Sequence, residues 1–184
     1  CKEVGIGVVT VVRKEVQVEL IKKLGSTQGV NSSDDDFMNQ LQSAIDDTDA
    51  YYGFDPIGGG KSVESVFKAM EQVAVDKMTE YSRYGSNQQK RMFIYGRLDV
   101  GPTILSPSYG FGWTLSGWLL FPFIHWVGTE TMGRMRRRVL ENLTTTFASH
   151  YKKRVDLEEM LSKEAVTDYR ATRAGEKYLV LPWK

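Results

Sequence analysis

Trp113-Thr-Leu-Ser-Gly-Trp-Leu-Leu-Phe-Pro-Phe-Ile-His-Trp-Val127 is the most apolar stretch of this chain of 184 residues. It holds three of the four tryptophans and no charged residue. A segment of this composition needs an apolar neighbour, which can be the protein's own core, a partner protein or a membrane. We call residues 113–127 the aromatic segment.

Two interpretations of the aromatic segment stay open. A helix that spans a bilayer needs roughly 20 apolar residues, and this segment is shorter and contains Gly117, Pro122 and His125. Its tryptophans at both ends nevertheless resemble an interfacial belt, and a basic flank follows. The alternative is a buried core segment that is broken at Pro122. The basic flank consists of Arg134, Arg136, Arg137 and Arg138.

Composition predicts one globular domain over residues 1–184. The apolar fraction of 41% and the charged fraction of 26% are ordinary for a folded domain. The net charge of +1 lacks the basic excess that is typical of nucleic-acid binding, so no nucleic-acid partner is expected. Cys1 is the only cysteine, which excludes an internal disulfide and a cysteine-based metal site.

The N-terminal cysteine also suggests a compartment. A chain that starts at Cys1 is typical of a bacterial lipoprotein, of an organelle protein that has lost its targeting peptide, or of a fragment whose sequence begins there. Together with the aromatic segment, this favours a membrane-associated location.

The N-terminal region predicts a β-hairpin. Residues 4–12 are rich in valine and indicate a buried strand, and residues 15–20 alternate polar and apolar side chains. Residues 13–14 would form the turn. The alternative is a short helix that follows the first strand and ends at Gly25.

Further elements are expected along the chain. Helical spacing predicts helices that begin after Asp36, over residues 62–81 with Ser62 as the cap, and over residues 135–151. Asp156 and Glu159 have the spacing of a capping box for a helix over residues 157–165. Residues 92–95 and 177–183 indicate strands, and residues 51–60 a glycine-rich loop. The expected fold class is α+β, with a few strands and about four helices.

Residues 55–62, Asp-Pro-Ile-Gly-Gly-Gly-Lys-Ser, resemble the phosphate-binding Walker A pattern. Asp55 stands where that pattern has its first glycine, and a carboxylate there would repel phosphate. No strand is predicted directly before it. We therefore interpret the stretch as a glycine linker and expect no cofactor.

No other motif predicts catalysis or metal binding. His125 and His150 are the only histidines, too few for a zinc site without cysteine ligands. The acidic clusters at residues 34–36 and 46–49 lack the spacing of a calcium loop. A nucleophile elbow is absent as well, so the sequence predicts that the chain is not an enzyme.

The spacing of Tyr169, Thr172 and Gly175 resembles the wing of winged-helix regulators. That resemblance implies a nucleic-acid-binding domain, against which the near-neutral charge argues.

We expect a non-catalytic accessory or structural subunit of a larger, membrane-associated protein complex, with other protein subunits and membrane lipid as partners. The alternative is a soluble small-ligand-binding protein or enzyme with an aromatic pocket and His125 as its polar group. A winged-helix-like nucleic-acid binder is the third possibility. The predicted membrane or partner contacts are Trp113, Trp118, Phe121, Phe123, Trp126, Arg134, Arg136, Arg137 and Arg138.

Overall fold

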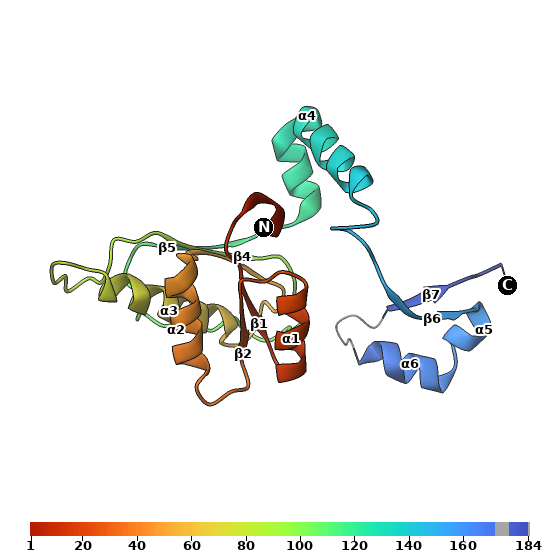
Figure 1. The fold of residues 1–184 in the computed structure, drawn as a ribbon, viewed down its shortest axis with the longest axis horizontal. Helices are drawn as coiled ribbons and strands as arrows, with labels where there is room; N and C mark the ends of the chain where they lie inside the picture. The colour runs from red at the N-terminus through yellow and green to blue at the C-terminus, as the bar shows by residue number, and fades with distance from the viewer. Residues whose placement is uncertain (172–176, 184) are drawn as a thin grey trace. The chain divides into compact units, whose positions relative to one another are not determined.

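The computed structural model describes residues 1–171 and 177–183 and divides into two compact units (Figure 1). Unit 1 is Cys1–Leu120 and unit 2 is Phe121–Lys184. The expectation of a single domain over residues 1–184 stays a prediction.

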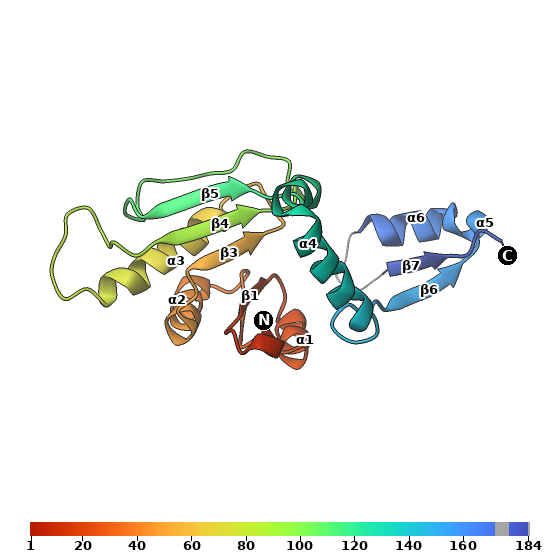
Figure 2. The ribbon, with the colours of Figure 1, turned by 90° about the horizontal axis from the view of Figure 1, so that it is seen from above.

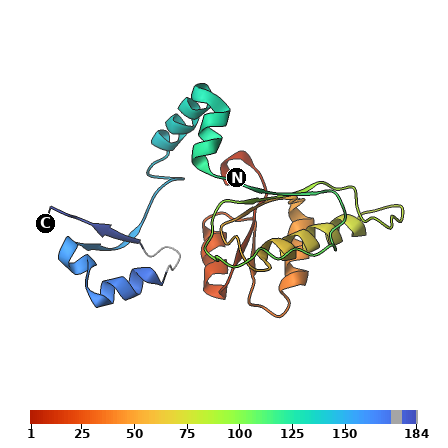
Figure 3. The ribbon, with the colours of Figure 1, turned by 180° about the vertical axis from the view of Figure 1, so that it is seen from behind.

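Unit 1 alternates strands with helices. After a short 3-10 turn, η1 (Lys2–Val4), the order is β1 (Val9–Val12), α1 (Glu15–Lys23), β2 (Gln28–Asn31), α2 (Phe37–Thr48), β3 (Tyr52–Asp55), α3 (Ser62–Asp76), β4 (Lys90–Ile94) and β5 (Trp113–Gly117). β1 pairs with β2, and a second sheet has the order β3-β4-β5. All of these pairs are parallel. Figures 1 and 3 show α1 and α2 on opposite sides of the β1–β2 pair, and α2 also packs against α3.

Unit 2 contains one strand pair and three helices. α4 (Leu120–Glu141) starts at the last residue of unit 1 and is interrupted at Gly128, where φ is 78° and ψ is 170°. It is followed by β6 (Tyr151–Val155), α5 (Leu157–Met160), α6 (Lys163–Arg170) and β7 (Lys177–Val180). β6 and β7 are also parallel.

The fold is therefore α/β with parallel strands. The predicted mixture of strands and helices is confirmed. The α+β class is corrected to α/β, because parallel strands need a crossover and helices supply it here. The described residues contain six α-helices rather than about four.

The predicted N-terminal hairpin is wrong, and the alternative helix is correct. α1 covers Glu15–Lys23, and Gly25 follows it with φ of 100°. Val18 and Ile21 of α1 pack so closely on Gly29 of β2 that a Cβ there would lie 3.0 Å from both side chains. This helix carries the chain from β1 to β2, so the two strands pair in parallel.

Four of the described strands were not predicted, and in two of them, β2 and β3, glycine interrupts the apolar pattern. β2 contains Gly29, and β3 lies inside the predicted loop over residues 51–60 and contains Gly53. A Cβ on Gly53 would lie 2.2 Å from Sδ of Met92, so close packing requires glycine at this position.

Other elements agree with the sequence. α2 begins after Asp36, and α3 begins at Ser62 but ends at Asp76 instead of residue 81. β4 overlaps the strand expected over residues 92–95, and β7 forms only the first four residues of the strand expected over residues 177–183. Asp156 accepts a hydrogen bond from the Glu159 N–H at 2.7 Å, which confirms the cap, although the predicted helix is split into α5 and α6.

The aromatic segment is divided between a strand and a helix. Its first five residues form β5, and the remainder lies in α4 from Leu120 onward. Pro122 is the third residue of α4, where its missing N–H costs no helical hydrogen bond, so it does not break the segment. α4 ends at Glu141, and Tyr151 begins β6, so the helix predicted over residues 135–151 is too long.

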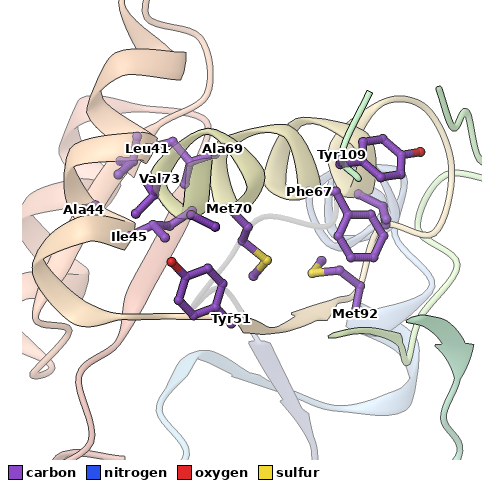
Figure 4. Close-up of a cluster of buried hydrophobic side chains, with 13 residues drawn as sticks. Leu41, Ala44, Ile45, Tyr51, Phe67, Ala69, Met70, Val73, Met92 and Tyr109 are labelled. Carbon is purple, nitrogen blue, oxygen red and sulfur yellow. The ribbon is translucent and has the colours of Figure 1, made fainter. Parts of the chain in front are cut away.

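The core of unit 1 lies between the sheet strands and the α2–α3 pair (Figure 4). Phe67 is fully buried and stacks on Tyr109 with ring centroids 5.2 Å apart. Met70 and Met92 lie beside it. α3 lies along one face of the β3-β4-β5 sheet, which fixes the positions of the loops that leave these strands (Figure 2).

Candidate functional site

Parallel strands end at the same edge of a sheet, and in open α/β sheets ligands bind outside that carboxyl edge. In unit 1 the β1–β2 sheet and the β3-β4-β5 sheet each have such an edge, and the two edges carry the segments that follow β1, β2, β3 and β4. They are residues 13–14, 32–36, 56–61 and 95–105. The candidate site is built from these segments.

Asp55 at the end of β3 organises the glycine loop, residues 56–61. Its carboxylate is buried and accepts the N–H of Ile57 at 3.1 Å, the N–H of Gly58 at 2.9 Å and the hydroxyl of Ser62 at 3.3 Å. The carboxylate is therefore occupied by its own loop. The strand whose absence spoke against a phosphate site is present as β3, and Ser62 bonds to Asp55 instead of capping α3.

The glycine loop is joined to the loop after β4. The Asp99 N–H donates to the Ile57 carbonyl at 2.9 Å, and the Thr103 hydroxyl donates to the Gly58 carbonyl at 2.5 Å. A Cβ on Gly96 would lie 2.4 Å from the carbonyl oxygen of Pro56. The two loops touch backbone to backbone and form one braced wall at the carboxyl edge.

Exposed cations follow β1, β3 and β4. Arg13 and Lys14 follow β1 directly, and the main chain turns there into α1, with the Arg13 N–H bonded to Oε1 of Gln17 at 3.2 Å. Arg97 and Lys61 are exposed in the loops after β4 and β3. Guanidinium and ammonium groups beside a helix N-terminus favour anionic groups such as phosphate.

The amino edge of the β3-β4-β5 sheet, where β3 and β4 begin, is held by internal ion pairs. Lys90, at the start of β4, is fully buried and lies 2.5 Å from Oε2 of Glu71, which also accepts the Ser86 hydroxyl at 2.6 Å. Burial alone would raise the pKa of Glu71, but the hydrogen bonds from Lys90 and Ser86 bring that pKa below its ordinary value.

A shallow hollow of about 270 Å³ lies at this same amino edge, lined by Tyr51 and Lys77 among others. Lys77 pairs with Asp46 at 2.9 Å and Asp49 at 2.8 Å, and these hydrogen bonds raise the pKa of Lys77. Because its charged groups already pair with one another, we interpret this edge as structural.

The residues that sequence analysis singled out as contacts do not form one site. Trp113 packs against Phe67 and Tyr109, with ring centroids 5.6 and 5.4 Å apart. Phe123 and Trp126 contact each other on α4 at 6.2 Å. Trp113 and Trp118 belong to unit 1, and the other predicted contacts belong to unit 2: Phe121, Phe123, Trp126, Arg134, Arg136, Arg137 and Arg138.

The exposure of these residues is consistent with contact, and their role stays a prediction. Phe121 and Trp126 are 77% and 82% exposed, and the four arginines are exposed. His125 is exposed on α4. In the described part of the chain, no helix is long and apolar enough to cross a membrane.

Two further sequence signals were tested. Over residues 1–171 and 177–183, no group of three or more His, Cys, Asp or Glu side chains is placed to hold a metal ion. Tyr169 of the wing-like pattern lies in α6, while Thr172 and Gly175 lie outside the described residues.

Sequence reasoning missed Arg13, Lys14 and the role of Asp55. It treated the first two as a hairpin turn and the third as a repulsive charge. The signal that could have found them is a basic pair directly after a valine-rich strand, because such a pair lies at the binding edge once the strands are parallel.

Comparison with known proteins gives a likeness in fold. No protein-family model matches the chain, and no curated protein matches it. The crystal structure of a candidate NADPH:quinone reductase from Mesorhizobium loti is similar, with a TM-score of 0.74 and 20% sequence identity. The match covers 98% of this chain and 47% of that chain, so this chain spans about half the length of that protein. At this identity the likeness shows an α/β fold with parallel strands.

Proposed function

We propose that unit 1 binds a phosphorylated dinucleotide cofactor of the NADPH type at the carboxyl edge of its parallel strands, as part of an oxidoreductase. The observation that carries the proposal is the exposed pair Arg13-Lys14, which follows β1 directly at the start of α1. The likeness in fold to a candidate NADPH:quinone reductase supports the same cofactor class. This corresponds to the ligand-binding alternative considered from the sequence.

The basic pair distinguishes between two cofactors. In dinucleotide-binding α/β folds, an acidic residue after a strand of this kind binds the ribose 2′-hydroxyl of NAD, whereas an arginine accommodates the 2′-phosphate of NADP. Here Arg13 and Lys14 come first after β1, and their charges would pair with that phosphate.

The glycine loop supports the proposal from the other side of the site. Gly58 and Gly60 have φ of 80° and 67°. The Asp55 carboxylate holds the loop by accepting the Gly58 N–H. The three consecutive glycines, Gly58 to Gly60, let a planar ligand approach the backbone closely. The contribution of this chain is then to hold the cofactor while the cofactor supplies hydride chemistry.

The test is a calorimetric titration of the whole chain with NADPH and with NADH. We expect NADPH to bind at least about tenfold more tightly, and we expect the double variant Arg13→Ala/Lys14→Ala to lose this preference. The matched control is Lys22→Ala/Lys23→Ala, which removes two exposed lysines from the last turn of the same helix. Absence of saturable binding, equal binding of the two nucleotides, or an equal loss in the control would refute the proposal.

The accessory-subunit hypothesis remains as a second candidate, which the exposed aromatic side chains of α4 favour. Phe121 and Trp126 are 77% and 82% exposed, and exposed large apolar side chains of this kind are typical of a contact surface.

A further inference from the structure

A β-bulge interrupts β6 in unit 2. Tyr151 pairs with Lys177, but Lys153 pairs with the next residue, Tyr178, so Lys152 is an extra residue in this strand. In a regular strand the side chains of adjacent residues point to opposite faces, and a bulge changes the direction of a side chain at its position. The bulge therefore allows two neighbouring lysines to lie on one face of the strand pair.

Both lysines reach helices on the same side of that pair. The Lys152 ammonium lies 2.7 Å from Oδ2 of Asp168 on α6, and the Lys153 ammonium pairs with Glu159 on α5. Figures 1 and 3 show α5 and α6 on one side of the β6–β7 pair. The bulge thus brings two positive charges to the face that carries the helices.

A hollow of about 780 Å³ opens beside these lysines. Its lining contains Lys152 and Lys153 together with Lys163, Thr167 and Tyr178. Sites for small molecules ordinarily have volumes of about 300–1,000 Å³, so this hollow is large enough for a complete small ligand. All of the residues that line it belong to unit 2.

The positive charge of Lys163 is available to a ligand. Lys163 is the first residue of α6, and its side chain is exposed. Among the residues that the structure describes, its ammonium has no ion-pair or hydrogen-bond partner. Lys152 and Lys153 are partly neutralised by their acids, so Lys163 should contribute most to the binding of an anion. Ammonium groups bind phosphate as point charges.

The acids at the hollow narrow the class of ligand. Glu164 and Asp168 also line it, and Asp168 accepts a hydrogen bond from the Tyr178 hydroxyl at 2.6 Å. This hydrogen bond raises the pKa of Tyr178, so the phenol stays protonated at neutral pH. Carboxylates repel a ligand that carries only negative groups, but they accept hydrogen bonds from hydroxyl groups. The lining therefore suits a molecule with one anionic group and several hydroxyl groups.

We propose that this hollow in unit 2 binds a sugar phosphate. The phosphate monoester supplies the one group of high negative charge that lysines bind, and the sugar supplies hydroxyl donors for the acids. In this assignment the phosphate lies at Lys152, Lys153 and Lys163, and the hydroxyl groups lie at Glu164 and Asp168. None of these residues belongs to the region of unit 1 to which we assign the cofactor, so the inference does not rest on the proposed function.

An NMR titration of the whole chain, labelled with ¹⁵N, with glucose 6-phosphate tests this inference. We expect saturable shifts of the amide signals of Lys153, Thr167 and Tyr178. Inorganic phosphate should bind at least about fivefold more weakly, and glucose should not shift these signals, because each supplies only part of the chemistry. Equal affinity for glucose 6-phosphate and inorganic phosphate, shifts with glucose, or no shifts at these amides would each overturn the inference.

Lys163→Ala tests the residue that should contribute most. We expect it to weaken the binding of glucose 6-phosphate by about tenfold, because a charge-assisted contact is lost. The fold should not change, since this side chain is exposed. The matched control is Arg154→Ala, which removes an exposed cation that follows Lys153 in β6, alternates to the other face and does not line the hollow. Unchanged binding in Lys163→Ala, or an equal loss in the control, would contradict the assignment.

Two further measurements separate the source of the ligand and the two proposals. Phosphoinositide headgroups have the same hydroxylated phosphate chemistry, so phosphatidylcholine vesicles with and without phosphatidylinositol 4-phosphate are added in place of the sugar phosphate. A response to the phosphoinositide vesicles without any response to glucose 6-phosphate would overturn the choice of a free sugar phosphate. Arg13→Ala/Lys14→Ala should leave the shifts caused by glucose 6-phosphate unchanged, so this inference and the NADPH proposal fail separately.

Discussion

The ammonium group of Lys90 lies 2.5 Å from Oε2 of Glu71, and both side chains are buried. The pair joins α3 to the first residue of β4, and the Gln88 carbonyl at 2.8 Å accepts a second bond from the same ammonium. No buried side-chain nitrogen or oxygen in the described residues lacks a hydrogen-bond partner. Removing one member leaves the other buried without the opposite charge, which costs more than the pair contributes.

Lys90→Met should destabilise unit 1 strongly. We expect a loss of about 3 kcal/mol in the free energy of unfolding, measured by urea denaturation, because Glu71 keeps a buried charge without its cation. The double variant Glu71→Gln/Lys90→Met should recover part of this loss. A double variant that is less stable than Lys90→Met would contradict the explanation.

The same pair predicts a dependence on pH. Because the folded state holds the pKa of Glu71 below its ordinary value of 4.5, the pair stabilises the fold above that value. This stabilisation should be lost as the pH falls from about 4.5 through the lower folded pKa. The measurement is the urea midpoint from pH 7 to pH 3 for the wild type and Glu71→Gln. The gap between the two should narrow below pH 4.5, and a constant gap would count against the assignment.

Gly96→Ala should disrupt the braced loops at the carboxyl edge. The added Cβ would lie 2.4 Å from the Pro56 carbonyl oxygen, which is backbone and cannot move aside cheaply. We expect a loss of about 2 kcal/mol, measured by thermal unfolding. Gly117→Ala is the matched control, because nothing lies within 4 Å of a Cβ there. Equal effects of the two changes would show that the close contact is not what requires glycine.

Phe121→Ser/Trp126→Ser tests the predicted partner surface of α4. Both side chains are mostly exposed, so the free energy of unfolding should change by less than about 0.5 kcal/mol. Sedimentation with anionic lipid vesicles, or co-purification with a larger complex, should decrease. The variant Arg136→Ala/Arg137→Ala measures how much the positive charges contribute to this association. In the wild type, that contribution should be lost at high salt. Unchanged association in both variants would contradict the accessory-subunit hypothesis.

The helices were more predictable than the strands. Phe37, Leu41 and Ile45 recur at helical spacing and are on the buried side of α2, so local sequence defined this element. β3 has only four residues and one is glycine, so its identity depends on β4 and on Met92 packing against it. These are contacts between residues far apart in the chain, and the local sequence pattern does not contain them.

The basic part of the candidate site was not predicted, because residues 13–14 were interpreted as the turn of a hairpin. Once residues 15–23 form a helix, Arg13 and Lys14 stop being a hairpin turn and lie at the end of a parallel strand. The position of Asp55 was visible in the sequence, but its inward orientation toward the Gly58 N–H was not. The sequence does not distinguish an aspartate whose carboxylate binds its own loop from one whose carboxylate faces solvent.

Every described strand pair is parallel, and this has a consequence for how the chain is made. Tyr52 pairs with Arg91, and Lys90 pairs with Trp113, so neither contact can be closed by a two-residue turn. The relative contact order is therefore high, and folding should be slower than for a helical bundle of this length. During synthesis, β3 leaves the ribosome well before β4 and must wait with its backbone unpaired. Chaperone demand is thus greatest while residues 52–94 emerge.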